Sequence, residues 1–360
     1  MSIASAAAVF ANIDRQRYEP VALRIEKDGR WRLLDRPPAA ASAADVIEQL
    51  REAGSARGGR DVVMPARPGD DTLLLVDRDD SGSSVVTGLG LDVIFPVLHG
   101  PYGEDGTVQG LLDLADVPYV GCGVLSSAVG MDKAVMKVLF KERGLRVAPW
   151  EVVRRHRWLA DRDAIIEQIS ETLTYPLFVK PANLGSSVGI SKVATQSALG
   201  AAIDVAAAFD PKVVVETGVV GAREIECAVL GNETPDASTP GEIVPSGEFY
   251  DYHAKYLSSG SETLIPAPLT PDVAEEVRRQ SIVAFDTIDG SGLARVDFLL
   301  GSTGELFINE INTMPGFTTI SMYSKLWAAS GVTYPVLIDR LIALAIERHA
   351  LQRQRRMSAF

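Results

Sequence analysis

ARVDFLL (residues 294–300), GSTG (residues 301–304) and ELFINEIN (residues 305–312) are the consecutive segments that decide the fold of the last third of this chain. The outer two segments alternate apolar with polar residues, and the segment between them is rich in turn-forming residues. This arrangement is typical of a β-hairpin. Its apolar positions, among them Phe298 and Ile311, indicate that the hairpin lies inside the protein.

The polar positions of this hairpin predict a metal site. With the turn centred on its Ser-Thr pair, we expect Arg295 opposite Glu310 and Asp297 opposite Ile308. Side chains alternate between the faces of a strand, so one face carries Arg295, Asp297, Glu310 and Asn312. Carboxylate and amide oxygens without Cys or His suit Mg²⁺ better than Zn²⁺, and the Arg can hold anionic substrate oxygens. The alternative, a surface hairpin held by cross-strand ion pairs, leaves Asp297 and Asn312 without a purpose.

The loop after the hairpin predicts a substrate-binding segment. Residues 313–321 read TMPGFTTIS and directly follow the expected metal ligands. Loops carried by a rigid strand often bind substrate. Here the Gly316 N–H can donate to a developing oxyanion, and Ser321 can hold a carboxylate at the start of a helix. An ordinary strand-to-helix turn is the alternative.

Composition limits the classes of function. With 360 residues, 46% of them apolar, the chain can form two or three globular domains. Its net charge of 35 − 47 = −12 repels phosphate backbones and anionic lipids, so we expect no nucleic-acid and no membrane partner. No stretch offers the roughly 20 apolar residues of a membrane span. The two cysteines, Cys122 and Cys227, exclude a disulfide scaffold and are expected to be buried free thiols.

We expect an α/β protein of three lobes, at residues 1–121, 122–215 and 216–360. In the first lobe strands alternate with helices, which predicts a parallel sheet covered on both faces. Its expected elements are a helix from residue 2, strands at 21–25, 72–76, 93–98 and 118–120, and helices at 43–53 and 108–115.

The second lobe is expected to begin with a helix from Ser126 to Arg143. Lys133 lies on that helix, and Lys137, one turn further, is interpreted as part of a solvated face. The remaining expected elements up to the C-terminus are strands at 147–153, 177–180, 212–216, 224–230 and 241–244, the hairpin, and helices at 163–173, 196–208, 271–288 and 335–351.

A glycine- and serine-rich loop suits phosphate binding. Lys180 ends an apolar strand and is followed by PANLGSSVG (residues 181–189), whose N–H groups and hydroxyls, including those of Ser186 and Ser187, can bind phosphate oxygens. The spacing differs from that of a P-loop. The loop also contains G-x-S-x-G, so a serine hydrolase is the competing interpretation, disfavoured because residues 181–184 separate the motif from its strand.

The next strand can supply a nucleoside site. Its apolar residues end in Glu216, and the backbone at Thr217 and Val219 can recognise an adenine edge. The carboxylate of Glu224 can bind ribose hydroxyls, as carboxylates do in other nucleotide sites. Alone, this signal is weak.

Taken in order, the motifs resemble the ATP-grasp superfamily and, within it, the D-alanine–D-alanine ligase family. The resemblance spans nearly the whole chain, and the combination of motifs is highly specific. It implies a three-lobed ATP-grasp fold, a cytoplasmic location, ATP as co-substrate, two Mg²⁺ or Mn²⁺ ions, and a homodimer. The matching segments are HG (99–100), GEDG (103–106), QG (109–110), MDK (131–133), KP (180–181), GSSVG (185–189), the acids at 216 and 224, YDYHAKY (250–256), the hairpin (295–312) and NTMPGFT (312–318).

The resemblance also implies a reaction in which ATP phosphorylates the carboxylate of one D-alanine and the amine of a second attacks the acyl phosphate, for cell-wall precursor synthesis. It assigns ATP contacts to Lys133, Lys180, Ser187, Glu216, Thr217, Val219, Glu224 and Lys255. It assigns Mg²⁺ to Asp297, Glu310 and Asn312, and substrate or oxyanion contacts to His99, Arg295, Gly316 and Ser321. Tyr256, hydrogen-bonded to Ser186, looks like the dipeptide-forming type rather than the D-lactate-using type.

The beginning of the chain departs from the family's pattern. The family begins with a further strand and a glycine-rich loop whose acid binds the first D-alanine, whereas this chain opens with MSIASA (residues 1–6). We therefore expect either a start codon assigned too late or an impaired or non-catalytic relative. Another ATP-grasp enzyme that joins a carboxylate to an amine is the remaining alternative.

Overall fold

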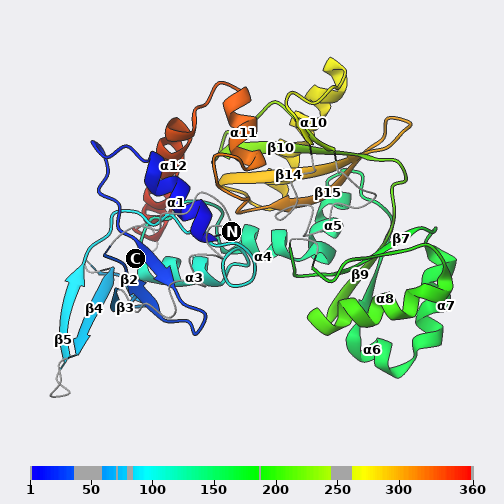
Figure 1. Cartoon of the computed structure of the whole chain (residues 1–360), viewed down its shortest axis with the longest axis horizontal. Coiled ribbons are helices and arrows are strands. Elements are labelled where there is room, and N and C mark those ends of the chain that lie inside the picture. The colour runs from blue at the N-terminus through cyan, green and yellow to red at the C-terminus, as the bar shows by residue number, and fades with distance from the viewer. Residues whose placement is uncertain are drawn as a thin grey trace.

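The structure is a computed structural model that describes residues 2–35, 59–69, 72–78, 84–185, 188–244 and 262–357. Three β-sheets follow one another along the chain. The first and second sheets lie at opposite ends of the molecule, with the third between them (Figure 1). The expected helix at 43–53 lies outside the described residues.

The first sheet is an antiparallel meander in which each strand pairs with the next one along the chain. Helix α3 (Thr107–Ala115) packs Leu112 and Ala115 onto it, against Leu73 and Leu75. The strands are β1 (Leu23–Ile25), β2 (Trp31–Leu33), β3 (Arg60–Val63), β4 (Leu73–Arg78) and β5 (Ser84–Leu89).

The prediction of a parallel sheet in the first lobe is wrong for this described sheet. Its first two strands are joined by residues 26–30 alone, and parallel neighbours need a crossover of about a dozen residues or more. The segments expected as strands at 93–98 and 118–120 form only one parallel bridge in the described structure, between Ile94 and Tyr119.

The second sheet has the strand order β6-β9-β7-β8, with every pair antiparallel. Three helices cover one face. In the longest of them, Leu199, Ile203 and Ala206 recur at helical spacing and pack against Val213 and Val215. The strands are β6 (Trp150–Arg154), β7 (Leu177–Pro181), β8 (Ser191–Val193) and β9 (Lys212–Thr217), and the helices are α6 (Arg155–Ala160), α7 (Arg162–Thr172) and α8 (Gln196–Phe209).

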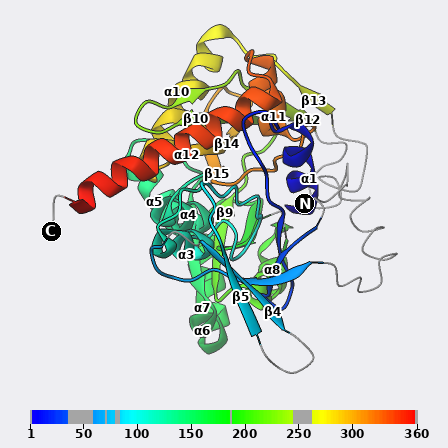
Figure 2. The same ribbon diagram turned by 90° about the vertical axis from the view of Figure 1, so that its left-hand side faces the viewer.

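The third sheet has the order β13-β12-β10-β14-β15, with β11 beside β10. Its strands are β10 (Arg223–Gly231), β11 (Asp236–Ala237), β12 (Gly241–Val244), β13 (Glu262–Leu264), β14 (Gly292–Leu300) and β15 (Leu306–Asn312). Its helices are α1 (Ser2–Asn12), α4 (Val124–Met131), α5 (Lys133–Glu142), α10 (Pro271–Thr287), α11 (Met322–Ala329) and α12 (Tyr334–Met357), whose C-terminal end projects from the body of the molecule (Figure 2).

The two faces of the third sheet are covered differently, and this difference creates the site. On one face Val296 and Phe298 pack against Phe285 of α10 and Phe140 of α5. On the other face, Leu293 packs under α11 and α12. Further along β14 that second face carries charged residues and borders a cavity. Since Met136 and Phe140 belong to the core of this sheet, the start of the expected second lobe packs on the third sheet.

The predicted hairpin forms, but its register differs from the prediction. Arg295 pairs with Asn312 and Asp297 with Glu310, whereas we expected Glu310 and Ile308 as their partners. The turn of the hairpin extends further toward the C-terminus than expected, because the Gly301 N–H donates to the Glu305 carbonyl at 2.8 Å. A β-bulge then shifts the register once more.

The β-bulge allows Ile308 and Ile311, which are three positions apart, to face the same core. Glu310 pairs with Asp297 and Ile308 with Phe298, so Asn309 is the additional residue between them. With strict alternation, Ile308 and Ile311 would lie on opposite faces. With the bulge both are buried in the same core, and the predicted sharing of one face by Arg295, Asp297, Glu310 and Asn312 survives.

The helix expected from Ser126 to Arg143 is two helices, α4 and α5. Asp132 lies between them in extended conformation, and its carboxylate accepts hydrogen bonds from the N–H groups of Ala134 (3.1 Å) and Val135 (3.2 Å). An Asp in this position caps a new helix rather than continuing the old one. The break places Lys133 at the first position of α5, beside the cavity.

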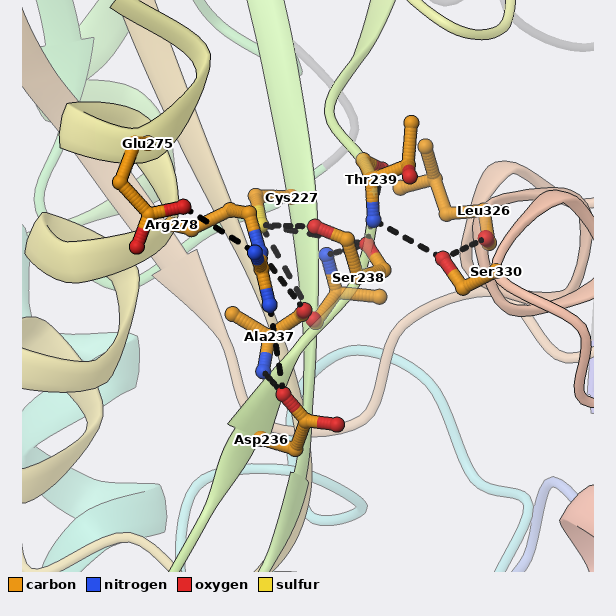
Figure 3. Close-up of polar contacts among 10 residues, drawn as sticks. Cys227, Asp236, Ala237, Ser238, Thr239, Glu275, Arg278, Leu326 and Ser330 are labelled. Carbon is orange, nitrogen blue, oxygen red and sulfur yellow. Dashed lines mark hydrogen bonds and ion pairs between the residues drawn. The ribbon is translucent and has the colours of Figure 1, made fainter. Parts of the chain in front are cut away.

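Polar contacts tie two covering helices to the turn after β11 (Figure 3). The Ala237 carbonyl accepts a hydrogen bond from Nε of Arg278 in α10 at 3.1 Å. The Thr239 N–H donates to Oγ of Ser330, directly after α11, at 2.9 Å. The Cys227 sulfur lies 3.4 Å from the Ser238 carbonyl oxygen. Cys122 and Cys227 are both buried free thiols, as predicted.

Within the described ranges, no single helix is long and apolar enough to span a membrane; one helix pair reaches that composition only across a bend of 103°. The domain boundaries expected at 121 and 215 stay predictions. Strand β9 ends at Thr217 and β10 begins at Arg223, so the connection between the second and third sheets lies just after the second boundary.

Candidate active site

A cavity of about 340 Å³ lies between the second and third sheets. Residues from both sheets and from the start of α5 line it. The predicted site residues among them are Lys133, Lys180, Glu216, Thr217, Val219, Glu224, Asp297 and Glu310. Positions far apart in the sequence therefore meet in one place.

The hairpin supplies a buried cluster of charges at this cavity. The Arg295 guanidinium donates from Nε (2.7 Å) and a terminal nitrogen (2.6 Å) to the two oxygens of Asp297. Asn312 Nδ2 donates to Asp297 at 3.0 Å. Arg295 Nε also lies 3.0 Å from a carboxylate oxygen of Glu226, the residue that pairs with Asp297 on β10. The pKa of Arg295 is well above its usual value because these carboxylates outweigh the cost of burial.

These residues fit a hard divalent cation. Asp297 and Glu310 are cross-strand partners, and the Asn312 amide touches Asp297, so three oxygen-bearing side chains share one face. Among the described residues, no three His, Cys, Asp or Glu side chains converge as a metal cluster. The predicted set differs because it consists of two acids and an amide.

Two lysines that line the cavity lie close to its carboxylates. The Lys133 ammonium donates to the Leu184 carbonyl at 2.7 Å and lies 3.6 Å from a carboxylate oxygen of Glu310. Lys180 pairs with Glu216 and lies 3.4 Å from Oδ1 of Asn309, the residue added by the β-bulge. Two ammonium groups that face two carboxylates are suited to polyphosphate oxygens bridged by a cation.

Lys137 corrects the sequence analysis. It was interpreted as part of a solvated face, yet its side chain is 2% exposed and its ammonium lies 2.8 Å from the second carboxylate oxygen of Glu216. Helical spacing places Lys133 and Lys137 on one face of α5. That face packs on β9, with Ala134 against Val214, so neither lysine points to solvent.

The remaining wall of the cavity is apolar. Phe178, Ile190, Val219 and Leu299 line it next to Glu216. Two backbone N–H groups at the end of β9 already donate hydrogen bonds within the protein. The Thr217 N–H donates to the Pro149 carbonyl at 2.9 Å, and the Gly218 N–H donates to the Pro176 carbonyl at 2.8 Å. A slot with apolar walls, a carboxylate and backbone groups fits a flat heterocycle.

The loop after β15 is held by the N-terminal helix. His99 donates from Nδ1 to the Met314 carbonyl (3.0 Å), and its Nε2 accepts from the Ser5 hydroxyl (2.9 Å). The Ser5 oxygen in turn accepts from the Phe317 N–H at 3.2 Å. Burial lowers the pKa of His99 to about 4, with the Met314 carbonyl opposing that change.

The predicted oxyanion and carboxylate residues lie in this loop. Ser321 Oγ accepts from the Thr318 N–H at 3.0 Å and precedes α11. A Cβ added to Gly316 would lie 3.2 Å from Ser321 Oγ, so the backbone of Gly316 approaches that hydroxyl closely. These two residues are therefore neighbours, as the expected substrate site requires.

Glu104, in the GEDG segment (103–106), is a buried acid near the cavity residues that was not predicted as a site residue. Glu104 accepts from the Gly100 N–H at 2.8 Å. Burial raises its pKa to about 7, with Lys133 and Arg295 among the charges that oppose this rise. The sequence signal was the acid itself, beside two glycines in a turn. Four predicted residues, Ser186, Ser187, Lys255 and Tyr256, lie outside the described residues.

Two protein-family models match this chain. Residues 1–122 match the family model for the D-ala D-ala ligase N-terminus, and residues 139–343 match that for the D-ala D-ala ligase C-terminus. The D-alanine–D-alanine ligase of Heliobacterium modesticaldum is 47% identical over 352 residues, covering 97% of this chain and 91% of the relative. That of Streptomyces coelicolor is 47% identical over 359 residues, covering 97% and 90%.

Solved structures are similar over the same extent. The D-alanine-D-alanine ligase from Coxiella burnetii superposes with a TM-score of 0.81 at 35% identity, covering 98% of this chain and 91% of the other. The VanG D-Ala:D-Ser ligase from Enterococcus faecalis superposes with a TM-score of 0.82 at 32% identity, covering 95% and 94%. Sequence and structure together place this chain in the D-alanine–D-alanine ligase family.

Proposed function

We propose that this chain uses ATP to join two D-alanine molecules into D-alanyl-D-alanine, a precursor for peptidoglycan synthesis. The observation that carries the proposal is the face shared by Arg295, Asp297, Glu310 and Asn312. Asp297 and Glu310 of this face line the cavity together with Lys133 and Lys180. Membership of the family supports the substrate. A cavity with cationic, acidic and apolar walls suits a metal-bound nucleotide.

The chemistry proceeds in two steps. A carboxylate oxygen of the first D-alanine attacks the γ-phosphorus of ATP, the bond to the bridging oxygen breaks, and ADP leaves. The neutral amine of the second D-alanine then attacks the acyl carbon and loses one proton, the C–O bond to phosphate breaks, and phosphate leaves with its electron pair. ATP is required because a free carboxylate is a poor electrophile, whereas an acyl phosphate is a reactive one.

The described residues divide this work. Lys133 and Lys180 hold phosphate oxygens, and Glu216 with the backbone of Thr217 and Val219 holds the base. Glu224 binds the ribose. The presence of all these residues in the cavity lining supports the assignments. Lys180 would exchange its contact with Glu216 for one with phosphate.

A second group of residues acts at the reacting atoms. Asp297, Glu310 and Asn312 would hold Mg²⁺ or Mn²⁺, which neutralises phosphate charge when bound. Arg295 and the Gly316 N–H stabilise the oxyanion formed by attack on the acyl carbon. His99 fixes the substrate-binding loop by its hydrogen bond to the Met314 carbonyl. Ser321 holds the carboxylate of the second D-alanine. Ser186, Ser187, Lys255 and Tyr256 complete the proposal from outside the described residues.

Phosphate release by the purified chain tests the function. We expect release that requires ATP, Mg²⁺ and D-alanine, with the dipeptide identified by mass spectrometry, and none with L-alanine. Separate reactions pair D-alanine with D-serine or D-lactate, because a D-Ala:D-Ser ligase has a similar fold. Faster formation of a mixed product would replace the proposed substrate, and ATP binding without turnover would indicate an impaired relative.

The serine hydrolase interpretation is tested by Lys180→Ala. A ligase should lose ATP-dependent phosphate release, because Lys180 lines the nucleotide cavity. An esterase should be unaffected by this substitution and require no ATP. We further propose a cytoplasmic location and a homodimer; sedimentation analysis of the full chain tests the latter.

A further inference from the structure

Lys137 is a buried cation to which the proposed reaction gives no task. Its side chain is 2% exposed, and that of its partner Glu216 is 4% exposed. Burying such a charge costs several kcal/mol unless a counter-charge compensates it. A lysine retained at such a position therefore calls for an explanation in terms of what it does to Glu216.

Helix and strand geometry bring the pair together. Alternate residues of β9 point toward α5, so that Lys212 meets Asp132, Val214 packs on Ala134 and Glu216 meets Lys137. Helix α5 lies between the second and third sheets (Figure 1). Lys137 thus approaches Glu216 from the protein side, with its ammonium 6.0 Å from the centroid of the Trp150 ring.

Two lysines divide the two oxygens of Glu216. Lys180 takes Oε1 and Lys137 lies 2.8 Å from Oε2. Among the described residues that line the cavity are Lys180 and Glu216, but not Lys137. When a nucleotide draws Lys180 toward its phosphates, Lys137 is therefore the cation that still fixes the carboxylate.

The two lysines also determine which hydrogen bonds Glu216 can make. Burial alone would raise the pKa of Glu216, but Lys137 and Lys180 outweigh it and hold the pKa at about 2. An ionised carboxylate accepts hydrogen bonds and cannot donate them. Facing the apolar slot formed by Phe178, Ile190 and Leu299, it attracts an amino group on a heterocycle and repels a carbonyl oxygen.

We propose that Lys137 is a positioning residue that sets the base selectivity of this nucleotide site, favouring a 6-aminopurine over a 6-oxopurine by holding Glu216 as a fixed acceptor. The proposal rests on the proposed function, in which the cavity binds ATP. It adds that selection of the base depends on a residue that touches no part of the nucleotide.

Binding of ADP and IDP with Mg²⁺ to the full chain tests the proposal by calorimetry. The two nucleotides differ at position 6 of the base, which carries an amino group in ADP and an oxo group in IDP. Lys137→Met keeps the side-chain volume and removes the charge. We expect the preference for ADP over IDP to fall by about 10-fold or more, because this is the change in affinity that corresponds to the loss of one hydrogen bond to a charged group.

Lys141→Met is the matched control. Lys141 lies one turn further along α5, is exposed, and places its ammonium 5.7 Å from the same Trp150 ring. It loses the same charge without touching Glu216, so we expect the wild-type preference. An unchanged preference in Lys137→Met, or an equal fall in Lys141→Met, would overturn the proposal.

A double variant keeps the proposal testable if Lys137→Met alone fails to fold. Combined with Glu216→Gln it leaves a neutral pair, which buried sites tolerate. If Lys137 acts only through Glu216, the preference in the double variant equals that in Glu216→Gln, and any further fall contradicts the proposal. These binding ratios need no D-alanine, so failure of the proposed ligation is seen separately, in phosphate release.

Discussion

Glu226→Gln tests whether the Glu226 carboxylate holds the Arg295 guanidinium in place. Arg295 lies between Asp297, at 2.6 and 2.7 Å, and Glu226, at 3.0 Å. If Asp297 gives its oxygens to a cation, Glu226 is the carboxylate that remains for Arg295. A hydrogen bond to a charged group contributes about 1.5–3 kcal/mol and a neutral one about 1 kcal/mol, so we expect the glutamine to cost about 0.5–2 kcal/mol.

That cost should appear in the chemical step, because Arg295 is proposed to stabilise the oxyanion. With about 1.4 kcal/mol for each factor of ten, we expect kcat to fall about 10-fold while KM for ATP changes little. Steady-state phosphate release at saturating D-alanine measures both constants.

A matched variant separates this effect from lost stability. Glu242 lies on the neighbouring strand β12 and forms a two-bonded pair with Arg223, at 2.8 and 2.6 Å. Glu242→Gln removes the same kind of charge away from the cavity lining. We expect the two variants to melt at similar temperatures and only Glu226→Gln to lose activity. Equal kcat values in both would refute the reasoning.

Three further predictions concern a metal ligand, a buried histidine and the core. Glu310→Gln should lower kcat at least about 100-fold with an unchanged circular dichroism spectrum; retained activity would remove Glu310 from the metal site. The pKa of His99 is lowered from 6.5 to about 4, so its contribution to stability is complete above pH 6.5 and is lost as the pH falls through 4. Between pH 7 and 5, urea unfolding should show wild type losing about 2 kcal/mol more than His99→Gln, and parallel losses would contradict this. Phe298→Ala, in a residue 1% exposed, should cost about 3–5 kcal/mol of unfolding free energy, and a loss below 1 kcal/mol would contradict the core assignment.

The hairpin shows what alternation can and cannot predict. The shared face of Arg295, Asp297, Glu310 and Asn312 follows from a period of two and is confirmed. Their pairing was wrong because the turn is longer than expected and because a β-bulge at Asn309 brings Ile308 and Ile311 into one core. Local sequence patterns do not contain that requirement.

Elsewhere the sequence lacked tertiary information. Lys137 resembles any solvated lysine until α5 is seen to pack on β9. Asp132 suits both a helix interior and a cap, and its role depends on the break before Lys133. Alternating strands and helices favoured a parallel first sheet, whereas the short connections between the described strands produce an antiparallel one.

The origin of the oxygen in the released phosphate tests the central claim most directly. D-alanine labelled with ¹⁸O in its carboxylate is incubated with the full chain, ATP and Mg²⁺, and the phosphate is analysed by mass spectrometry. Transfer through an acyl phosphate predicts one labelled oxygen in each phosphate for each dipeptide formed. Phosphate that carries no label would show that water, rather than the D-alanine carboxylate, attacks ATP, and would contradict the account.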